Sequence, residues 1–165
     1  MLTLPKIVKK PAQYYVAIRS MVKMGEVGTA AMKHLPALEI WMRDRGIAPT
    51  GPAFIKYNLI NMKKGMELEF GQVIAAKAKG DKQVVAGRLP AGKYAALTYW
   101  GPYDDLMQVN AVLIGWAMLM GLKWDATKSR AGDRFASRVE FYPTDPAKEP
   151  DTSKWETEVA IKLAK

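Results

Sequence analysis

The chain has 165 residues, 49% of them hydrophobic and 25% charged, which predicts one globular domain and excludes a collagenous, low-complexity or wholly disordered chain. It has no cysteine and one histidine, so disulfides, thiol nucleophiles, thiolate zinc sites and a histidine-dependent triad are excluded, and we expect neither a metal nor a cofactor. The net charge of +9 makes nucleic acid a partner to weigh, but the cations are scattered and match no nucleic-acid-binding motif, so we expect none.

The N-terminal residues lack the apolar core of a signal peptide, and the longest apolar run, residues 111–122, is shorter than the roughly 20 residues of a membrane span. We therefore expect a cytoplasmic protein without membrane contact.

The first half of the chain is predicted to contain a strand, a helix and two further strands. In the first strand Tyr15 and Ala17 alternate with Val16 and Ile18, so the two pairs face opposite sides of a sheet. The helix is predicted to end before Gly46, and Pro36 should kink it or start a second segment. Its apolar stripe comprises Ala31, Leu35, Leu38 and Met42.

A later strand of this half places its apolar side chains on one face and Glu67 and Glu69 on the other. The apolar set comprises Met66, Leu68 and Phe70. Residues 79–82 form a predicted turn that leads into the second half.

The second half repeats this order. In its first strand one face carries Tyr94, Ala96, Thr98 and Trp100. A helix over residues 106–120 follows, and because it is apolar nearly all round we expect it to be deeply covered. Residues 144–153 form a loop, and in the closing strand Glu156 and Glu158 face away from the apolar set. Tyrosines, a tryptophan and glutamates should therefore share the face of the sheet that carries no helix.

The two halves are similar in sequence. Residues 11–18 align with residues 90–97, and residues 66–70 align with residues 155–159. This predicts an α+β fold of duplicated strand-helix-strand-strand units, about residues 7–76 and 84–163, within one domain. The units should form an antiparallel sheet with helices on one face and a ligand groove between the halves. The duplication would make Glu69 equivalent to Glu158.

Residues 89–103 (LPAGKYAALTYWGPY), together with Gly115-Trp116, residues 120–122 and the closing Trp-x-Thr-Glu at 155–158, resemble the GyrI-like small-molecule-binding family. The resemblance covers residues 7–163 and implies a ligand groove. It places the family's acidic pocket residue at Glu158 and an aromatic wall at Tyr94, Trp100 and Tyr103. From the first half of the chain it adds Tyr15 and Tyr57 to this wall.

The resemblance implies a standalone module that binds hydrophobic, often cationic aromatic compounds. Relatives also include a branch that hydrolyses cyclopropane-bearing compounds, for which Glu158 would be the catalytic residue, and a gyrase-inhibitory protein that binds a protein partner. The residues alone permit plainer roles: tyrosines most often pack in the core, and Glu158 could simply pair with a lysine on the same face of the sheet.

Overall fold

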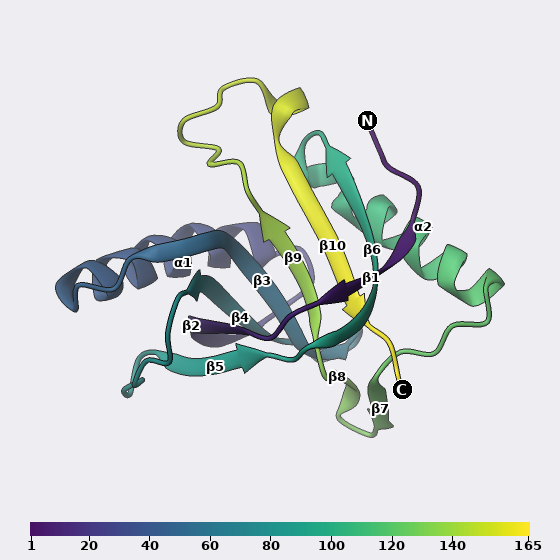
Figure 1. The fold of residues 1–165 in the computed structure, drawn as a ribbon, viewed down its shortest axis with the longest axis horizontal. Helices are drawn as coiled ribbons and strands as arrows, with labels where there is room; N and C mark the ends of the chain where they lie inside the picture. The colour runs from purple at the N-terminus through teal and green to yellow at the C-terminus, as the bar shows by residue number, and fades with distance from the viewer.

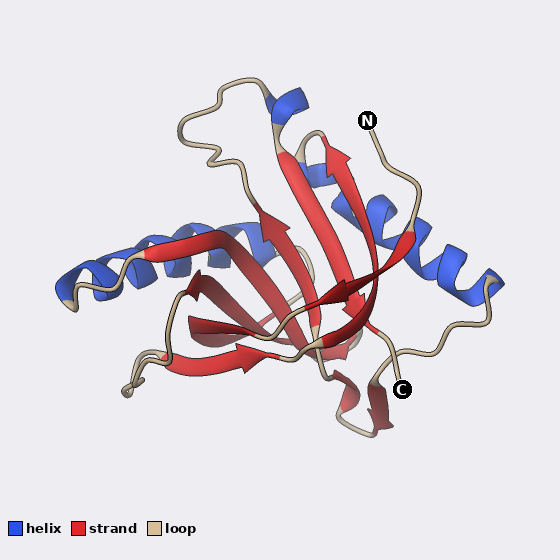
Figure 2. Cartoon of the chain, in the orientation of Figure 1, coloured by secondary structure: helices blue, strands red, loops and turns tan.

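The computed structural model describes residues 1–165, which form one strongly curved sheet of ten strands and two helices (Figures 1 and 2). The helices are α1 (Val27–Asp44) and α2 (Leu106–Leu119), with short 3-10 turns η1 (Tyr103–Asp105) and η2 (Thr152–Lys154). The strands are β1 (Lys6–Lys10), β2 (Gln13–Val22), β3 (Pro49–Asn61), β4 (Gly65–Ile74), β5 (Val85–Leu89), β6 (Gly92–Trp100), β7 (Ala126–Ser129), β8 (Gly132–Phe135), β9 (Arg138–Tyr142) and β10 (Glu156–Lys162). The predicted α+β class is confirmed.

The strand order is β1-β6-β10-β9-β3-β4-β2-β5, with the β7–β8 hairpin attached to β3. Every pairing is antiparallel. Outward from the central β9–β3 pair, β10 corresponds to β4, β6 to β2, and β1 to β5. Glu69 lies opposite Arg19 on β2, and Glu158 lies opposite Thr98 on β6, which are the places that the predicted sequence repeat assigns to them. The topology therefore supports duplication, and superposition of residues 7–76 on 84–163 remains its direct test.

Both helices cover the same face of the sheet, as the alternating pattern predicts. The core under α1 includes Val16, Ile18, Leu38, Trp41 and Met42, with Leu68 and Phe70 beside it. The core under α2 includes Ala95, Leu97, Val109, Leu113, Val159 and Ile161. The helices lie toward opposite ends of the curved sheet, and the central strands β3 and β9 run between the two cores (Figure 1).

The opposite face, which we call the far face, carries a third core of ten buried side chains. Its centre is Phe54, fully buried, with its ring centroid 5.2 Å from that of Tyr15 and 5.9 Å from that of Phe141. The remaining members are Ala17, Val73, Leu89, Tyr94, Ala96, Val139 and Ala160. Because the curved sheet fills its own concave side in this way, the centre of the far face is packed, and any open hollow lies at its rim.

One expectation about the helices is wrong, and one of the two alternatives for Pro36 is excluded. The helix α2 is not deeply covered, since Met118 and Leu119 are 74% and 86% exposed. It packs on the sheet through one side only, and no other element of the chain covers its outer side. The helix α1 does not end or restart at Pro36, which lies inside it. Pro36 is exposed, so the carbonyl group that its missing N–H would have bonded can face solvent. Neither helix is long and apolar enough to cross a membrane.

Candidate functional site

The sheet distributes the predicted site residues over several places rather than one. Tyr15 and Glu69 lie on the far face in the first half. Glu158 lies on the same face in the second half, at its rim. Tyr57 and Tyr103 lie on the helix side, where they join residues that the sequence analysis did not single out.

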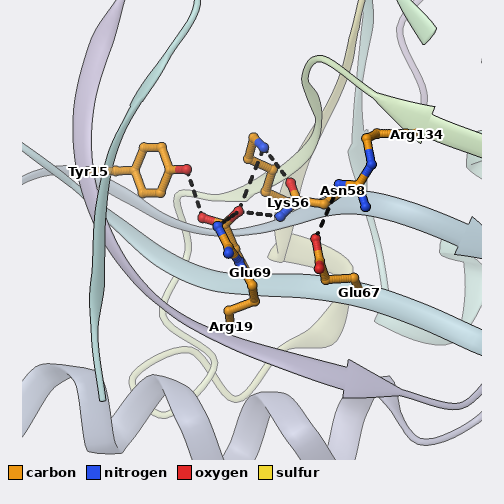
Figure 3. Close-up of polar contacts among 7 residues, drawn as sticks. All are labelled: Tyr15, Arg19, Lys56, Asn58, Glu67, Glu69 and Arg134. Carbon is orange, nitrogen blue, oxygen red and sulfur yellow. Dashed lines mark hydrogen bonds and ion pairs between the residues drawn. The ribbon is translucent and has the colours of Figure 1, made fainter. Parts of the chain in front are cut away.

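Glu69 is the centre of a buried polar network (Figure 3). Its side chain is on β4 and is 1% exposed, and the Tyr15 hydroxyl donates to its Oε1 at 2.7 Å. Asn58 donates to Oε2, and Arg19 and Lys56 approach the same oxygen at 3.5 and 3.8 Å. Both carboxylate oxygens are therefore satisfied by protein groups, so Glu69 is suited to holding β2, β3 and β4 together rather than to binding a ligand.

The Tyr15 hydroxyl belongs to this same network. Burial, followed by the charge and hydrogen bond of Glu69, raises the pKa of Tyr15 well above its ordinary value of 10.0. Tyr15 therefore remains a neutral donor to the carboxylate at physiological pH.

Glu158 lies beside a small surface cavity of about 170 Å³ that is lined mainly by β1 and β6. Its carboxylate is 31% exposed and pairs with Lys10, whose amine also lies 5.1 Å from the ring centroid of Phe141. This is the lysine pairing that the residues alone permitted. The volume is below that of ordinary ligand pockets, roughly 300–1,000 Å³, and one internal cation already occupies the carboxylate.

Two predicted aromatic residues do not line a site with Glu158. Tyr94 is 2% exposed in the far-face core, and its hydroxyl donates to the carbonyl oxygen of Pro90 at 2.6 Å. Trp100 is half-buried at the end of β6, opposite Glu156 rather than Glu158.

The helix side holds the more promising arrangement, at the centre of the sheet. Glu140 is on β9, directly opposite Ile55 on β3 and Val159 on β10. Since Ile55 belongs to the core of α1 and Val159 to the core of α2, the carboxylate projects from the sheet between the two helix cores.

Aromatic side chains from four segments gather near this carboxylate. Tyr57 on β3 donates its hydroxyl hydrogen to Glu140 Oε1, and Tyr142 shares the face of Glu140 on β9. The ring centroid of Tyr103 lies 5.4 Å from that of Tyr142 and 4.7 Å from that of Trp155. We call Glu140, Tyr57, Tyr103, Tyr142 and Trp155 the Glu140 cluster.

The Glu140 carboxylate is only partly satisfied. Its side chain is 3% exposed, and Oε2 accepts no hydrogen bond of ordinary geometry, although the Asn110 side chain on α2 lies nearby. Burial raises the pKa of Glu140, and the Tyr57 hydrogen bond, the charge of Arg138 and the Asn110 side chain oppose that rise. Burial also raises the pKa values of Tyr57 and Tyr142 well above the ordinary range, so both stay neutral. The cluster thus offers a desolvated acceptor surrounded by neutral, half-buried aromatic rings.

The sequence contains a signal for Glu140. In residues 138–142, Val139 and Phe141 alternate with charged or hydroxyl-bearing residues, which predicts a strand with Glu140 on the opposite face from both. A glutamate in a strand of large apolar residues is rarely buried without a reason. No group of three or more histidine, aspartate or glutamate side chains is placed to hold a metal ion.

A family model, the GyrI-like small-molecule-binding domain, matches residues 4–164. Among curated proteins, no sequence is significantly similar to this chain.

Solved structures share its fold. One is EcmrR in a complex with DNA (TM-score 0.79, 19% identity), where 99% of this chain aligns but spans only 58% of the EcmrR chain. The separate EcmrR C-terminal domain gives a TM-score of 0.76 at 19% identity, with 98% of this chain and 97% of that domain covered.

Two more distant structures are those of SAV2435 bound to tetraphenylphosphonium (TM-score 0.58, 11% identity, 98% and 94% covered) and a hydrolase from Listeria innocua (TM-score 0.58, 12% identity, 98% and 92% covered). At these identities the likeness establishes the fold alone.

Proposed function

The chain belongs to the GyrI-like small-molecule-binding family, and we propose that it binds a hydrophobic, cationic aromatic compound at the Glu140 cluster. The observation that carries this proposal is the unpartnered Oε2 of a carboxylate that is 3% exposed.

A buried carboxylate without enough donors destabilises the protein that contains it, and a ligand cation can supply the missing interaction. The rings of Tyr57, Tyr103, Tyr142 and Trp155 add apolar contact and cation–π attraction for the same ligand. The bound tetraphenylphosphonium of SAV2435, a lipophilic aromatic cation, supports this ligand class.

The test is direct binding of tetraphenylphosphonium, measured by isothermal titration calorimetry on the wild-type protein and two matched variants. Glu140→Gln should weaken binding by about 1–3 kcal/mol, roughly 5- to 150-fold, because a charge-assisted contact to the ligand is lost. Glu158→Gln removes the same charge at the rim of the far face and should leave the affinity within about threefold.

The opposite pattern, in which only Glu158→Gln weakens binding, would place the ligand in the rim cavity beside Lys10 and refute the Glu140 assignment. Equal loss in both variants would mean that the net charge of the protein, rather than either site, sets the affinity.

A second candidate function is hydrolysis of a strained, cyclopropane-bearing compound. The observation that favours it is the buried Glu140 carboxylate beside the Tyr57 hydroxyl, since a positioned and desolvated carboxyl group, its pKa raised by burial, can donate or accept a proton in such a step. The structural similarity to a Listeria hydrolase is compatible with it. Mass spectrometry of an activated cyclopropane incubated with the protein tests this, and turnover that survives Glu140→Gln would reject it.

A further inference from the structure

A second charged side chain, Arg138, stands on the same face of the sheet as the Glu140 carboxylate. It precedes Glu140 by two residues on β9, so the two side chains are neighbours along the strand. Its guanidinium lies 5.0 Å from the ring centroid of Phe135 and 6.0 Å from that of Tyr57. The cation is therefore held against aromatic rings, one of which also belongs to the Glu140 cluster.

The Arg138 guanidinium donates no hydrogen bond within the protein. Its Nε is buried without a partner, and no carboxylate lies within ion-pair distance. Burial lowers the pKa of Arg138, and the nearby Tyr57, Glu140 and Asp133 oppose that shift. A guanidinium presents five donors in a rigid fork and stays protonated in proteins. A buried N–H donor of this kind is costly unless an acceptor satisfies it.

The site thus contains two incompletely satisfied groups of opposite polarity, the Oε2 acceptor of Glu140 and the Nε donor of Arg138. Residues two apart on a strand are separated by about 6.5 Å. For a simple lipophilic cation at Glu140, a partly buried positive charge on the neighbouring side chain of the same strand face would be repulsive. A ligand that carried both a positive and a negative group would satisfy both.

We propose that the Glu140 cluster selects zwitterionic aromatic compounds, with the cationic part of the ligand at Glu140 and its carboxylate or similar anionic group at Arg138. This inference rests on the proposed function, because it names the ligand class of the same site. Arg138 is then the residue that distinguishes a zwitterion from a plain cation of the same shape.

Rhodamine B and its methyl ester provide a matched pair of probes. Rhodamine B is a zwitterion at neutral pH, whereas esterification removes its carboxylate and leaves the cation. Fluorescence anisotropy should show that the wild-type protein binds rhodamine B at least about fivefold more tightly than the ester, since a charge-assisted contact adds to the affinity. Arg138→Gln should abolish this preference, mainly by weakening the binding of rhodamine B.

Arg134→Gln is the control, because it removes the same charge from the nearby strand β8, where Arg134 is exposed and pairs with Glu67. It should leave the preference unchanged. If Arg138→Gln does not fold, Arg138→Met keeps the apolar stem against Phe135 and Tyr57 and repeats the test.

The outcomes separate this inference from the proposed function. If Glu140→Gln weakens both dyes but the wild-type protein shows no preference, or the preference survives loss of Arg138, only the zwitterion inference fails. If neither dye binds, or binding does not depend on Glu140, the proposed function fails and this inference fails with it.

Discussion

Removal of the Tyr15 hydroxyl is the sharpest test of the buried network around Glu69. In Tyr15→Phe the ring keeps its edge-on contact with Phe54 at 5.2 Å, and only the 2.7 Å hydrogen bond to the carboxylate is lost. A hydrogen bond to a charged group contributes about 1.5–3 kcal/mol, and the acceptor left behind is 1% exposed and cannot recover a bond from water. We expect the free energy of unfolding to fall by about 2–3 kcal/mol.

Tyr94→Phe is a matched control from the second half of the chain. Tyr94 is as buried as Tyr15, but its hydroxyl donates to the neutral carbonyl oxygen of Pro90. Loss of a neutral hydrogen bond should cost only about 0.5–1.5 kcal/mol. Urea unfolding followed by tryptophan fluorescence measures both, and an unchanged m-value would show that the unfolded states are comparable. If Tyr15→Phe costs no more than Tyr94→Phe, the carboxylate does not depend on this donor and our account of the network is wrong.

Tyr15, Leu119 and two glycines allow further tests. The folded state raises the pKa of Tyr15 above its ordinary value of 10.0, so the unfolded chain releases that proton first as the pH rises. Stability measured by thermal melts should therefore fall above pH 10, and it should fall less steeply in Tyr15→Phe. Leu119→Lys should change the free energy of unfolding by less than about 0.5 kcal/mol, since the side chain is 86% exposed; a loss above about 2 kcal/mol would mean that the outer side of α2 is covered after all. Gly71→Ala should lower the free energy of unfolding by about 1–3 kcal/mol, because the added Cβ would lie 2.3 Å from the Phe54 ring. Gly115 lies inside α2 with open space around it, so Gly115→Ala should raise the free energy of unfolding by up to about 1 kcal/mol. The same sign for both variants would contradict the packing described.

The sequence predicted which side chains share a face of each strand, because side chains alternate along a strand whatever elements pack against it. Val159 and Ile161 therefore lie under α2, and Glu69 lies on the far face, as their spacing required. The outer side of α2 could not be predicted in the same way. A helix that is apolar all round does not reveal how many of its sides the fold will cover, since that depends on the elements that happen to lie nearby.

The grouping of side chains in the Glu140 cluster could not be predicted, for a similar reason. Tyr57 and Tyr103 were predicted to share a site with Glu158, but the structure places Glu158 on the other face with Lys10 and places the two tyrosines in the Glu140 cluster. Alternation within residues 138–142 would have given the side of the strand on which Glu140 lies. It would not have shown that this side is closed off from solvent between two helix cores.

The exclusion of solvent from Glu140 depends on the pairing of β3 with β9. In this pairing Ile55 lies opposite Glu140, although the two residues belong to different halves of the chain. The two halves each supply one part of the hydrogen bond at this point, the Tyr57 hydroxyl from the first and the Glu140 carboxylate from the second. A ligand held between them would contact both halves at once and would bind only where β3 and β9 are paired. Binding would therefore stabilise the paired arrangement by an amount that grows with ligand concentration, which couples occupancy of the site to the association of the two halves of the sheet.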